Sequence, residues 1–271
     1  MARGEPVTIE PYYQTPDGAI RIYNARWEDV LTAGVFAPKD IALVHADPPY
    51  GVAERTDRKA RGRVGALAKA SALVGASARR VGAVGMPHDF PPVVGDDRPF
   101  SPQPLLDLSR PTVLWGANHY AGRFLSSGPS WLVWDKREEQ TPDDNADAEI
   151  AWSDLGGPVR VFRHWWRGAL RKTEKEHIHL HPTQKPEALS AWVFAHAEAR
   201  KKLKRGDTIL VPYMGSGPDL RPAMAAGYKV IACDVEEWCC RTAVSARLGA
   251  MPRPEPSDTL GPLFASPLTS A

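Results

Sequence analysis

One short stretch carries the residues best suited to chemistry: Asp47, Pro48, Pro49 and Tyr50. It follows the apolar run 41–44, which predicts a buried parallel strand because the run is brief and ends close to two prolines. Consecutive prolines cannot continue a strand ladder, and they hold the preceding residue extended. The stretch therefore predicts a stiff corner that displays a carboxylate, free carbonyl groups and a ring. Open α/β sheets bind ligands at this edge, although an ordinary Asp-Pro turn explains the tetrapeptide equally well.

A glycine turn near the other end of the chain is the second candidate site. The run 208–211 predicts a buried strand, the turn contains Gly215 and Gly217, and the next predicted strand ends on Asp234. Glycines let backbone N–H groups approach a ligand at the positive end of a helix, and an acid at the next strand's tip can accept hydrogen bonds from ribose hydroxyls. The turn has neither a P-loop lysine nor a third glycine, which argues against NTP and NAD. An ordinary packing turn is the alternative.

Charge is distributed unevenly along the chain. The net charge is only +2, yet residues 51–85 hold eight basic side chains against two acidic ones. This segment is dominated by Ala, Gly and Val and cannot build a core, so we expect a mobile basic loop. Such a loop can gain order on a polyanion, because phosphate contacts need cationic side chains; the alternative is a merely solvated insertion.

Composition excludes several classes of protein. The hydrophobic fraction of 43% and the charged fraction of 24% are those of a soluble globular protein, and no apolar run is long enough to span a membrane. Three cysteines and the lack of a signal-peptide pattern predict a reducing, cytoplasmic location. Residues 177–181 contain histidine at every second position, but no carboxylate or cysteine pattern accompanies them, so we expect no metal site.

The remaining pattern predicts an α/β fold with a doubly wound, mainly parallel sheet in a single domain, 1–250. Residues 251–271 are expected to form a tail, and 86–110 and 138–149 to form loops. Further strands are predicted at 20–23, 112–115, 131–134, 159–163 and 229–233, and helices at 27–31, 186–200 and 236–248.

Four pieces of this chain resemble the S-adenosylmethionine-dependent amino-methyltransferases of DNA. They are the catalytic motif 47–50, the stretch 181–186 that precedes the family's cofactor loop, the cofactor loop 212–217, and the pair 115–118 with 131–136, which is similar to members from phages and restriction systems. Each piece alone has limited specificity, but the four in this order are specific. The order resembles the permuted β class, with a Rossmann-like methyltransferase fold. Permutation moves the termini to another surface loop of the same sheet.

The resemblance implies a role for each candidate residue. Asp47 and the Pro48 carbonyl would accept the N–H groups of an exocyclic amine, beside Pro49, and Tyr50 would stack on a base flipped out of double-stranded DNA. The implied cofactor contacts are Gly215 and Gly217 for the methionine part, Asp234 for the ribose, and Thr183 and Lys185 for the carboxylate. Tyr213 and Ser216 of the same loop are also implied to bind the cofactor.

The chain also departs from the family pattern. Val211 stands where the family usually has an Asp that helps to bind the cofactor's amino group, and Asn24-Ala25 stands where a Gly-Asp pair is usual. Asp219 is close enough in sequence to compensate for Val211. Loss of both acids is the feature that favours a competing interpretation, a DNA-binding module with a methyltransferase fold and no chemistry.

Position 47 is an Asp rather than a Ser, and by analogy with the family this favours adenine N6 over cytosine N4 as the methylated amine. A cytosine-N4 enzyme is the close alternative, and nothing in the sequence excludes an RNA substrate. Residues 135–180, together with the basic loop, are the candidate region for target recognition. The oligomeric state, the target sequence and any partner nuclease have no recognisable sequence signal.

Overall fold

A computed structural model of the 271-residue chain describes residues 8–52, 90–123, 130–138, 146–167, 170–175 and 180–250. All structural statements below concern these residues. The predicted basic loop, apart from its first two residues, and the predicted tail lie outside them.

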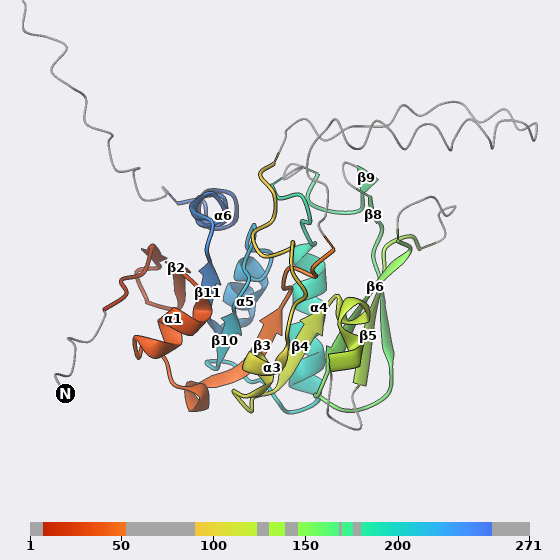
Figure 1. Ribbon diagram of the computed structural model, residues 1–271, viewed down its shortest axis with the longest axis horizontal. Helices are drawn as coiled ribbons and strands as arrows, with labels where there is room; N and C mark the ends of the chain where they lie inside the picture. Colours follow the sequence, from red (N-terminus) through yellow and green to blue (C-terminus); the bar gives the residue numbers. More distant parts are fainter. Residues whose placement is uncertain are drawn as a thin grey trace, which may run out of the picture.

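Within the described residues, nine strands form one sheet in the order β1-β2-β11-β10-β3-β4-β6-β5-β7 (Figure 1). The five strands from β2 to β4 in this order run parallel, whereas β6 is antiparallel to both of its neighbours. Strands β8 and β9 form a separate hairpin. The bounds are β1 Tyr13–Gln14, β2 Ile20–Asn24, β3 Ile41–Ala46, β4 Thr112–Trp115, β5 Ser130–Asp135, β6 Ala148–Ser153, β7 Arg160–Arg163, β8 Trp166–Arg167, β9 Leu170–Arg171, β10 Thr208–Val211 and β11 Lys229–Asp234.

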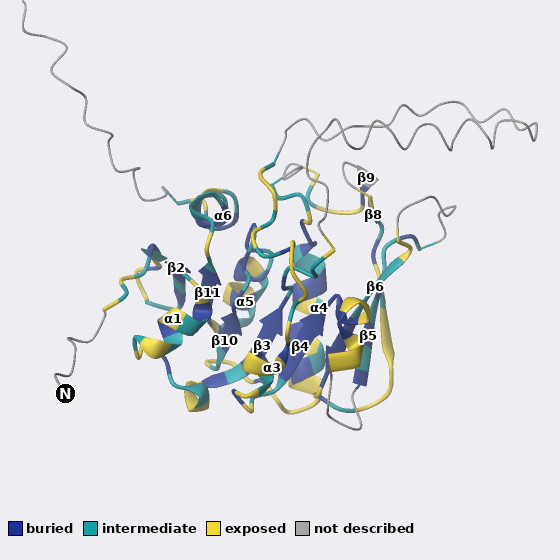
Figure 2. Cartoon of the chain, in the orientation of Figure 1, coloured by how far each residue is buried: buried dark blue, intermediate teal, exposed yellow. Residues whose placement is uncertain are grey.

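Helices cover both faces of this sheet. The α-helices are α1 Trp27–Thr32, α3 Gln103–Leu106, α4 Glu187–Ala199, α5 Leu220–Ala226 and α6 Glu237–Thr242, with short 3₁₀ turns at Pro38–Asp40, Ala117–His119 and Ala121–Arg123. Buried side chains of α4 and α5 belong to one apolar cluster, and those of α1 and α3 belong to another. The central strands are buried on both faces, as the dark blue arrows of Figure 2 show. The predicted α/β fold with a mainly parallel, doubly wound sheet is therefore confirmed.

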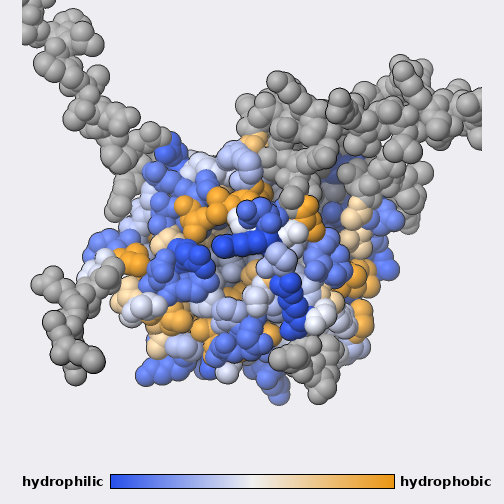
Figure 3. Space-filling view, in the orientation of Figure 1, coloured by the Kyte–Doolittle hydropathy of each residue, from blue (hydrophilic) through white to orange (hydrophobic). Residues whose placement is uncertain are grey.

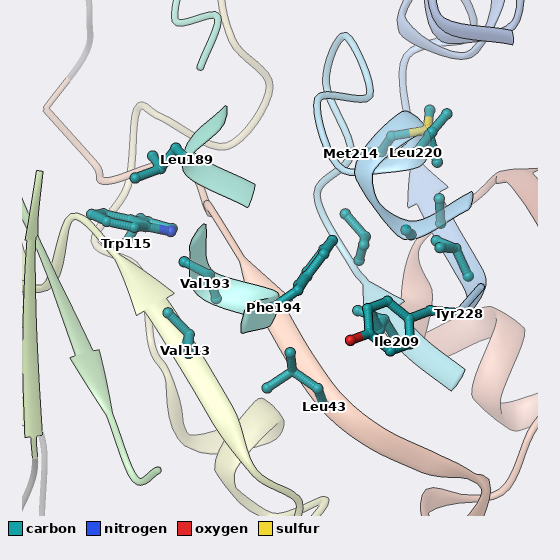
Figure 4. Packing of buried hydrophobic residues seen from close by; sticks show 14 of the residues in the cluster. Leu43, Val113, Trp115, Leu189, Val193, Phe194, Ile209, Met214, Leu220 and Tyr228 are labelled. Atoms are coloured by element: carbon teal, nitrogen blue, oxygen red, sulfur yellow. The ribbon is translucent and has the colours of Figure 1, made fainter. Parts of the chain in front are cut away.

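Helix α4 packs against one face of the sheet (Figure 4). Leu189, Val193 and Phe194 pack in the cluster that contains Leu43 of β3 and Ile209 of β10, and all five side chains are at most 2% exposed. Burying side chains of this kind stabilises a fold by about 1.5–3 kcal/mol each. Pro186 precedes the first turn of α4, where a missing N–H costs nothing, and it sets where the helix starts.

Three sequence predictions need correction. The proline-rich segment 86–110 is expected to be a loop, but it contains the short helix α3, whose Leu105 is buried in the core. The sequence also predicts a loop over 138–149, but Ala148 and Glu149 open strand β6. Pairing of these two residues with Asp135 and Trp134 of β5 supplies the order that the acidic composition of this segment does not predict. The third correction concerns the helix expected over 236–248: α6 ends at Thr242 and continues as a π-helical turn, Ala243–Arg247.

None of the described helices is long and apolar enough to cross a membrane. On the face shown in Figure 3, hydrophilic and hydrophobic residues lie side by side rather than in separate regions.

Candidate active site

The carboxyl ends of β3, β4, β10 and β11 open into one cavity of about 1350 Å³. Ten of the eleven candidate residues line it: Asp47, Pro48, Pro49, Tyr50, Thr183, Lys185, Tyr213, Gly215, Ser216 and Asp234. Gly217 does not. Its φ is +70°, and a Cβ at this position would lie 2.9 Å from the side chains of Ala243 and Leu220, so glycine is required both by the backbone conformation and by the packing of the turn against its neighbours.

The corner after β3 holds its carboxylate and its ring in contact. The Tyr50 hydroxyl donates to Asp47 Oδ1 at 2.5 Å, and the Tyr50 ring stacks on His119 with centroids 5.0 Å apart. The ring also lies against Gly116, where a Cβ would come within 2.0 Å of it. Gly116 also has a φ of +72°, so this position requires glycine both for its backbone conformation and for the close approach of the Tyr50 ring.

Lys185 joins this corner to a second carboxylate. Its ammonium lies 2.6 Å from Asp47 Oδ2 and 2.9 Å from Glu149 Oε2, and it donates to the Tyr50 hydroxyl at 3.2 Å. Lys136 approaches the other Glu149 oxygen at 2.9 Å. The structure therefore places Lys185, which we expected at the cofactor's carboxylate, between two acids of the cavity wall.

The four charges in this row control one another's ionisation. Burial opposes the charge of Lys185, but the two carboxylates raise its pKa above the ordinary value. Burial alone would raise the pKa of Glu149, yet the ammonium groups of Lys185 and Lys136 hold it at about 2. Burial raises the pKa of Asp47, and Lys185 counteracts this. The row consists of two lysines that alternate with two carboxylates, an arrangement in which each buried charge has a partner.

A buried chain of hydrogen bonds lies behind the corner. The indole N–H of Trp115 donates to His45 Nε2 at 2.8 Å, so the proton of a neutral His45 is on Nδ1, and this N–H donates to Asp219 Oδ1 at 2.6 Å. Asp219 is 5% exposed and lines the cavity, and its Oδ2 has no partner among the described residues. Val211, which stands where the family that the chain resembles usually has an Asp, lines the same cavity.

Asp234 holds the glycine turn in place. It accepts the backbone N–H of Gly215 at 2.8 Å and that of Glu236 at 2.9 Å, and burial raises its pKa to about 6. The hydroxyl of Ser216, also in the cavity wall, is buried and has no hydrogen-bond partner among the described residues. An unpaired buried hydroxyl is costly, and because Ser216 belongs to the cavity wall, a bound ligand is one way to pair it.

Thr183 and Tyr213 border the cavity from different sides. Thr183 is exposed, and its N–H and hydroxyl lie 3.3 and 3.2 Å from Nδ1 of His181. His181 stacks on Trp238 with centroids 5.2 Å apart, and burial lowers its pKa to about 4. The Tyr213 hydroxyl accepts the indole N–H of Trp27 at 3.3 Å, and burial raises its pKa to about 12.

Sequence reasoning missed Glu149, Lys136 and His45. The acidic composition around Glu149 predicts a loop, and Lys136 stands just beyond the strand predicted at 131–134. A carboxylate and a lysine on adjacent strands are a recognisable pair once β6 is identified, and the alternation of Ile150 and Trp152 is the only local signal for that strand. Within the described residues no group of three or more His, Cys, Asp and Glu side chains could hold a metal ion; His177 and His179 lie outside them.

Comparison with known proteins shows a likeness of structure. No family model matches the chain, and no curated protein matches it. The PvuII DNA methyltransferase (cytosine-N4-specific) aligns with a TM-score of 0.50 and 11% identity over 88% of each chain. M1.HpyAVI in complex with SAM aligns with a TM-score of 0.45 and 16% identity over 84% of this chain and 98% of the other. A putative DNA modification methylase from Thermus thermophilus aligns with a TM-score of 0.39 and 14% identity over 78% and 87%. The first of these likenesses shows a shared fold.

Proposed function

We propose that this chain transfers a methyl group from S-adenosylmethionine to the exocyclic amine of a base in DNA, with adenine N6 favoured. One observation carries the proposal: the Asp47 corner and the glycine turn follow β3 and β10, which are parallel neighbours, and both line one cavity. The four motifs and the fold shared with a cytosine-N4 DNA methyltransferase support it. The motif order supports the permuted β class in the same way.

The corner suits an amine that is a poor nucleophile because its lone pair is delocalised into the base. Asp47 and the Pro48 carbonyl accept its two N–H groups and favour a pyramidal nitrogen with a localised lone pair. The cofactor supplies a sulfonium methyl group. With the cofactor bound, the nitrogen would take the methyl group while the electron pair of the carbon–sulfur bond stays on sulfur, and Asp47 and solvent would accept the proton that the nitrogen loses. Most of the rate then comes from positioning and from prearranged dipoles.

The residues present fit this cofactor. The unpaired Ser216 hydroxyl and the free oxygen of Asp219 are polar groups that the described part of the protein leaves unsatisfied in the wall beside the glycine turn. We assign Asp219 to the cofactor's ammonium group, in place of the acid that Val211 lacks. The hydrogen bond from His45 fixes the orientation of the Asp219 carboxylate in the cavity wall. Asp234 remains assigned to the ribose and Thr183 to the carboxylate.

This assignment of Asp219 is tested by calorimetry with two ligands. S-adenosylhomocysteine carries the amino-acid group, whereas 5′-methylthioadenosine lacks it. Asp219→Asn should weaken binding of the first by about 10- to 100-fold, the usual worth of a hydrogen bond to a charged group, and leave the second within about twofold. Equal losses for both ligands would mean that Asp219 supports the fold rather than the ammonium group.

The reaction is tested directly with methyl-labelled S-adenosylmethionine and methylation-free DNA, followed by digestion and identification of the labelled nucleoside by mass spectrometry. We expect label on adenine N6. Label on cytosine N4 moves the assignment to the alternative, and an RNA arm checks that substrate. Asp47→Ala should abolish labelling; an equally labelled variant means contamination.

The region 135–180 is our candidate for target recognition. Its described part carries Arg163, whose side chain is 69% exposed and 3.7 Å from Asp135, and Arg167 in the cavity wall. Arginine side chains so placed suit phosphate contacts. Replacing Arg163 and Arg167 should weaken DNA binding and flatten its salt dependence. Unchanged binding rejects this role.

A non-catalytic DNA-binding module is the competing function, and Val211 and Ala25 favour it. A thermal-shift assay distinguishes this module from the enzyme, because a saturating ligand that binds only the native state must raise the melting temperature. No shift with S-adenosylmethionine, together with no labelled base in diverse DNA, would establish the module instead of the enzyme.

A further inference from the structure

Asp47 and Lys185 present a hydrogen-bond acceptor and a donor side by side in the cavity. Asp47 Oδ2 and Lys185 Nζ are 2.6 Å apart, and both groups also contact the same third atom, the Tyr50 hydroxyl. That hydroxyl donates to Asp47 Oδ1 and accepts from Lys185. A single small polar group thus already satisfies this acceptor and this donor at once.

The amine-bearing edge of a base has the same pattern. In adenine the N6 amine donates and the adjacent ring nitrogen accepts, and in cytosine the N4 amine and its adjacent ring nitrogen do the same. Guanine and thymine present a carbonyl and a ring N–H at the corresponding positions, the reverse pattern. Enzymes that act on a flipped base identify it through this Watson–Crick edge.

We propose that Lys185 recognises the target base by donating a hydrogen bond to the ring nitrogen beside the methylated amine. The inference rests on the proposed function and deepens it. The amine N–H takes the place of the Tyr50 hydroxyl on Asp47, and the ring nitrogen takes its place on Lys185. The phenol is thereby released from the edge, and its ring becomes available to the face of the base.

The surroundings of Lys185 suit this role. An ammonium has three N–H donors. The carboxylates of Asp47 and Glu149 form ion pairs with it at 2.6 and 2.9 Å and keep it charged, and the Tyr50 hydroxyl, at 3.2 Å the longest of the three contacts, accepts a hydrogen bond from it. Its side chain is 8% exposed, so a base that removes this contact must replace it or leave a buried donor unpaired.

Recognition and rate are separable here. A hydrogen bond to the ring nitrogen draws electron density from the base, so it does not make the amine a better nucleophile. Its effect is therefore expected in KM, as discrimination between bases, rather than in kcat. Because adenine and cytosine share the edge, Lys185 admits both and rejects guanine and thymine, and the choice between the two lies elsewhere in the cavity.

The test uses duplex DNA that contains the protein's own methylation site, mapped by the labelling experiment. At an adenine target, 1-deazaadenine replaces the ring nitrogen by C–H, and 7-deazaadenine is the matched control, because it keeps the whole amine-bearing edge. At a cytosine target, 3-deazacytosine serves the same purpose. Wild-type protein and Lys185→Met are compared, with S-adenosylhomocysteine binding measured in parallel.

We expect the wild-type KM to rise about 10- to 100-fold on 1-deazaadenine and to change less than about twofold on 7-deazaadenine. Lys185→Met should lose this difference. Equal KM values for the wild type on all three bases overturn the inference, whether or not the variant folds. If Lys185→Met loses S-adenosylhomocysteine affinity and keeps the discrimination, Lys185 belongs to the cofactor's carboxylate. No methylation of the natural base overturns the proposed function as well.

Discussion

Lys185 stands between two carboxylates, and its removal should destabilise the fold in a pH-dependent way. Lys185→Met keeps the length of the side chain but leaves Asp47 and Glu149 with Lys136 as their only nearby ammonium group among the described residues. The side chains of Glu149 and Lys185 are 21% and 8% exposed, so solvent does little to compensate the loss. We expect a large effect for a single substitution at the edge of a cavity.

The magnitude follows from the ionisation of Glu149. Its pKa is about 2 in the folded protein against an ordinary value of 4.5, which corresponds to about 3 kcal/mol of stability at neutral pH. That stability is fully present above pH 4.5 and is lost as the pH falls through 2. Removing one partner of a buried ion pair typically costs about 3–5 kcal/mol. Lys136 retains part of the contribution, so we expect a loss of about 3 kcal/mol at pH 7.

The variant should also reverse the sign of the pH dependence. With one ammonium left for two carboxylates, the folded state retains a proton that the unfolded state releases, so stability falls as the pH rises. The deficit relative to wild type should be smallest near pH 5 and largest near pH 8. Lys172→Met is the matched control, because Lys172 pairs with Glu138 at 2.8 Å but is 54% exposed, and such pairs contribute about 0–1 kcal/mol.

Urea unfolding from pH 5 to pH 8, with Glu149→Gln and the double variant to complete a cycle, measures these quantities. A deficit below about 1 kcal/mol that does not change with pH would refute the idea that the row of charges acts as a buried unit. In that case Lys185 would behave like the exposed control.

Two further predictions concern the corner and the turn. Gly116→Ala should cost about 1–3 kcal/mol more stability than Gly34→Ala and reduce methyl transfer. Both glycines have φ above +70°, but only at Gly116 does the new Cβ meet the Tyr50 ring. Equal losses of stability in urea unfolding would contradict this. Affinity for S-adenosylhomocysteine should fall as the pH drops below about 6, because protonation of Asp234 removes the acceptor for the ribose. Asp234→Asn should be weak at every pH, and a wild-type affinity that stays constant in calorimetry from pH 5 to pH 8 would contradict the assignment.

Sequence patterns located the strands that position the site. Apolar runs identified β3, β4, β10 and β11, and the prolines and glycines that follow β3 and β10 identified the corner and the turn. Local signals were enough because a buried parallel strand is an apolar run and its exit needs residues that break the ladder. These are properties of a few neighbouring residues.

Partners across the sheet could not be predicted in this way. His45 and Asp219 are 174 positions apart, and Glu149 meets Lys185 only because β6 inserts antiparallel beside β4. Strand order and register decide these contacts, and a single sequence does not encode them locally. The roles of the site residues stay predictions, which the ligand experiments above address.

The corner and the glycine turn follow two adjacent strands, β3 and β10. Neighbouring strands lie about 4.8 Å apart and are tied by backbone hydrogen bonds, so the sheet sets the spacing between the two subsites. The β8–β9 hairpin contributes no ladder bond between β3 and β10. If the function and the target-recognition region that we propose are right, this hairpin can be exchanged between related chains, by recombination or by grafting, without changing the separation between the corner and the glycine turn.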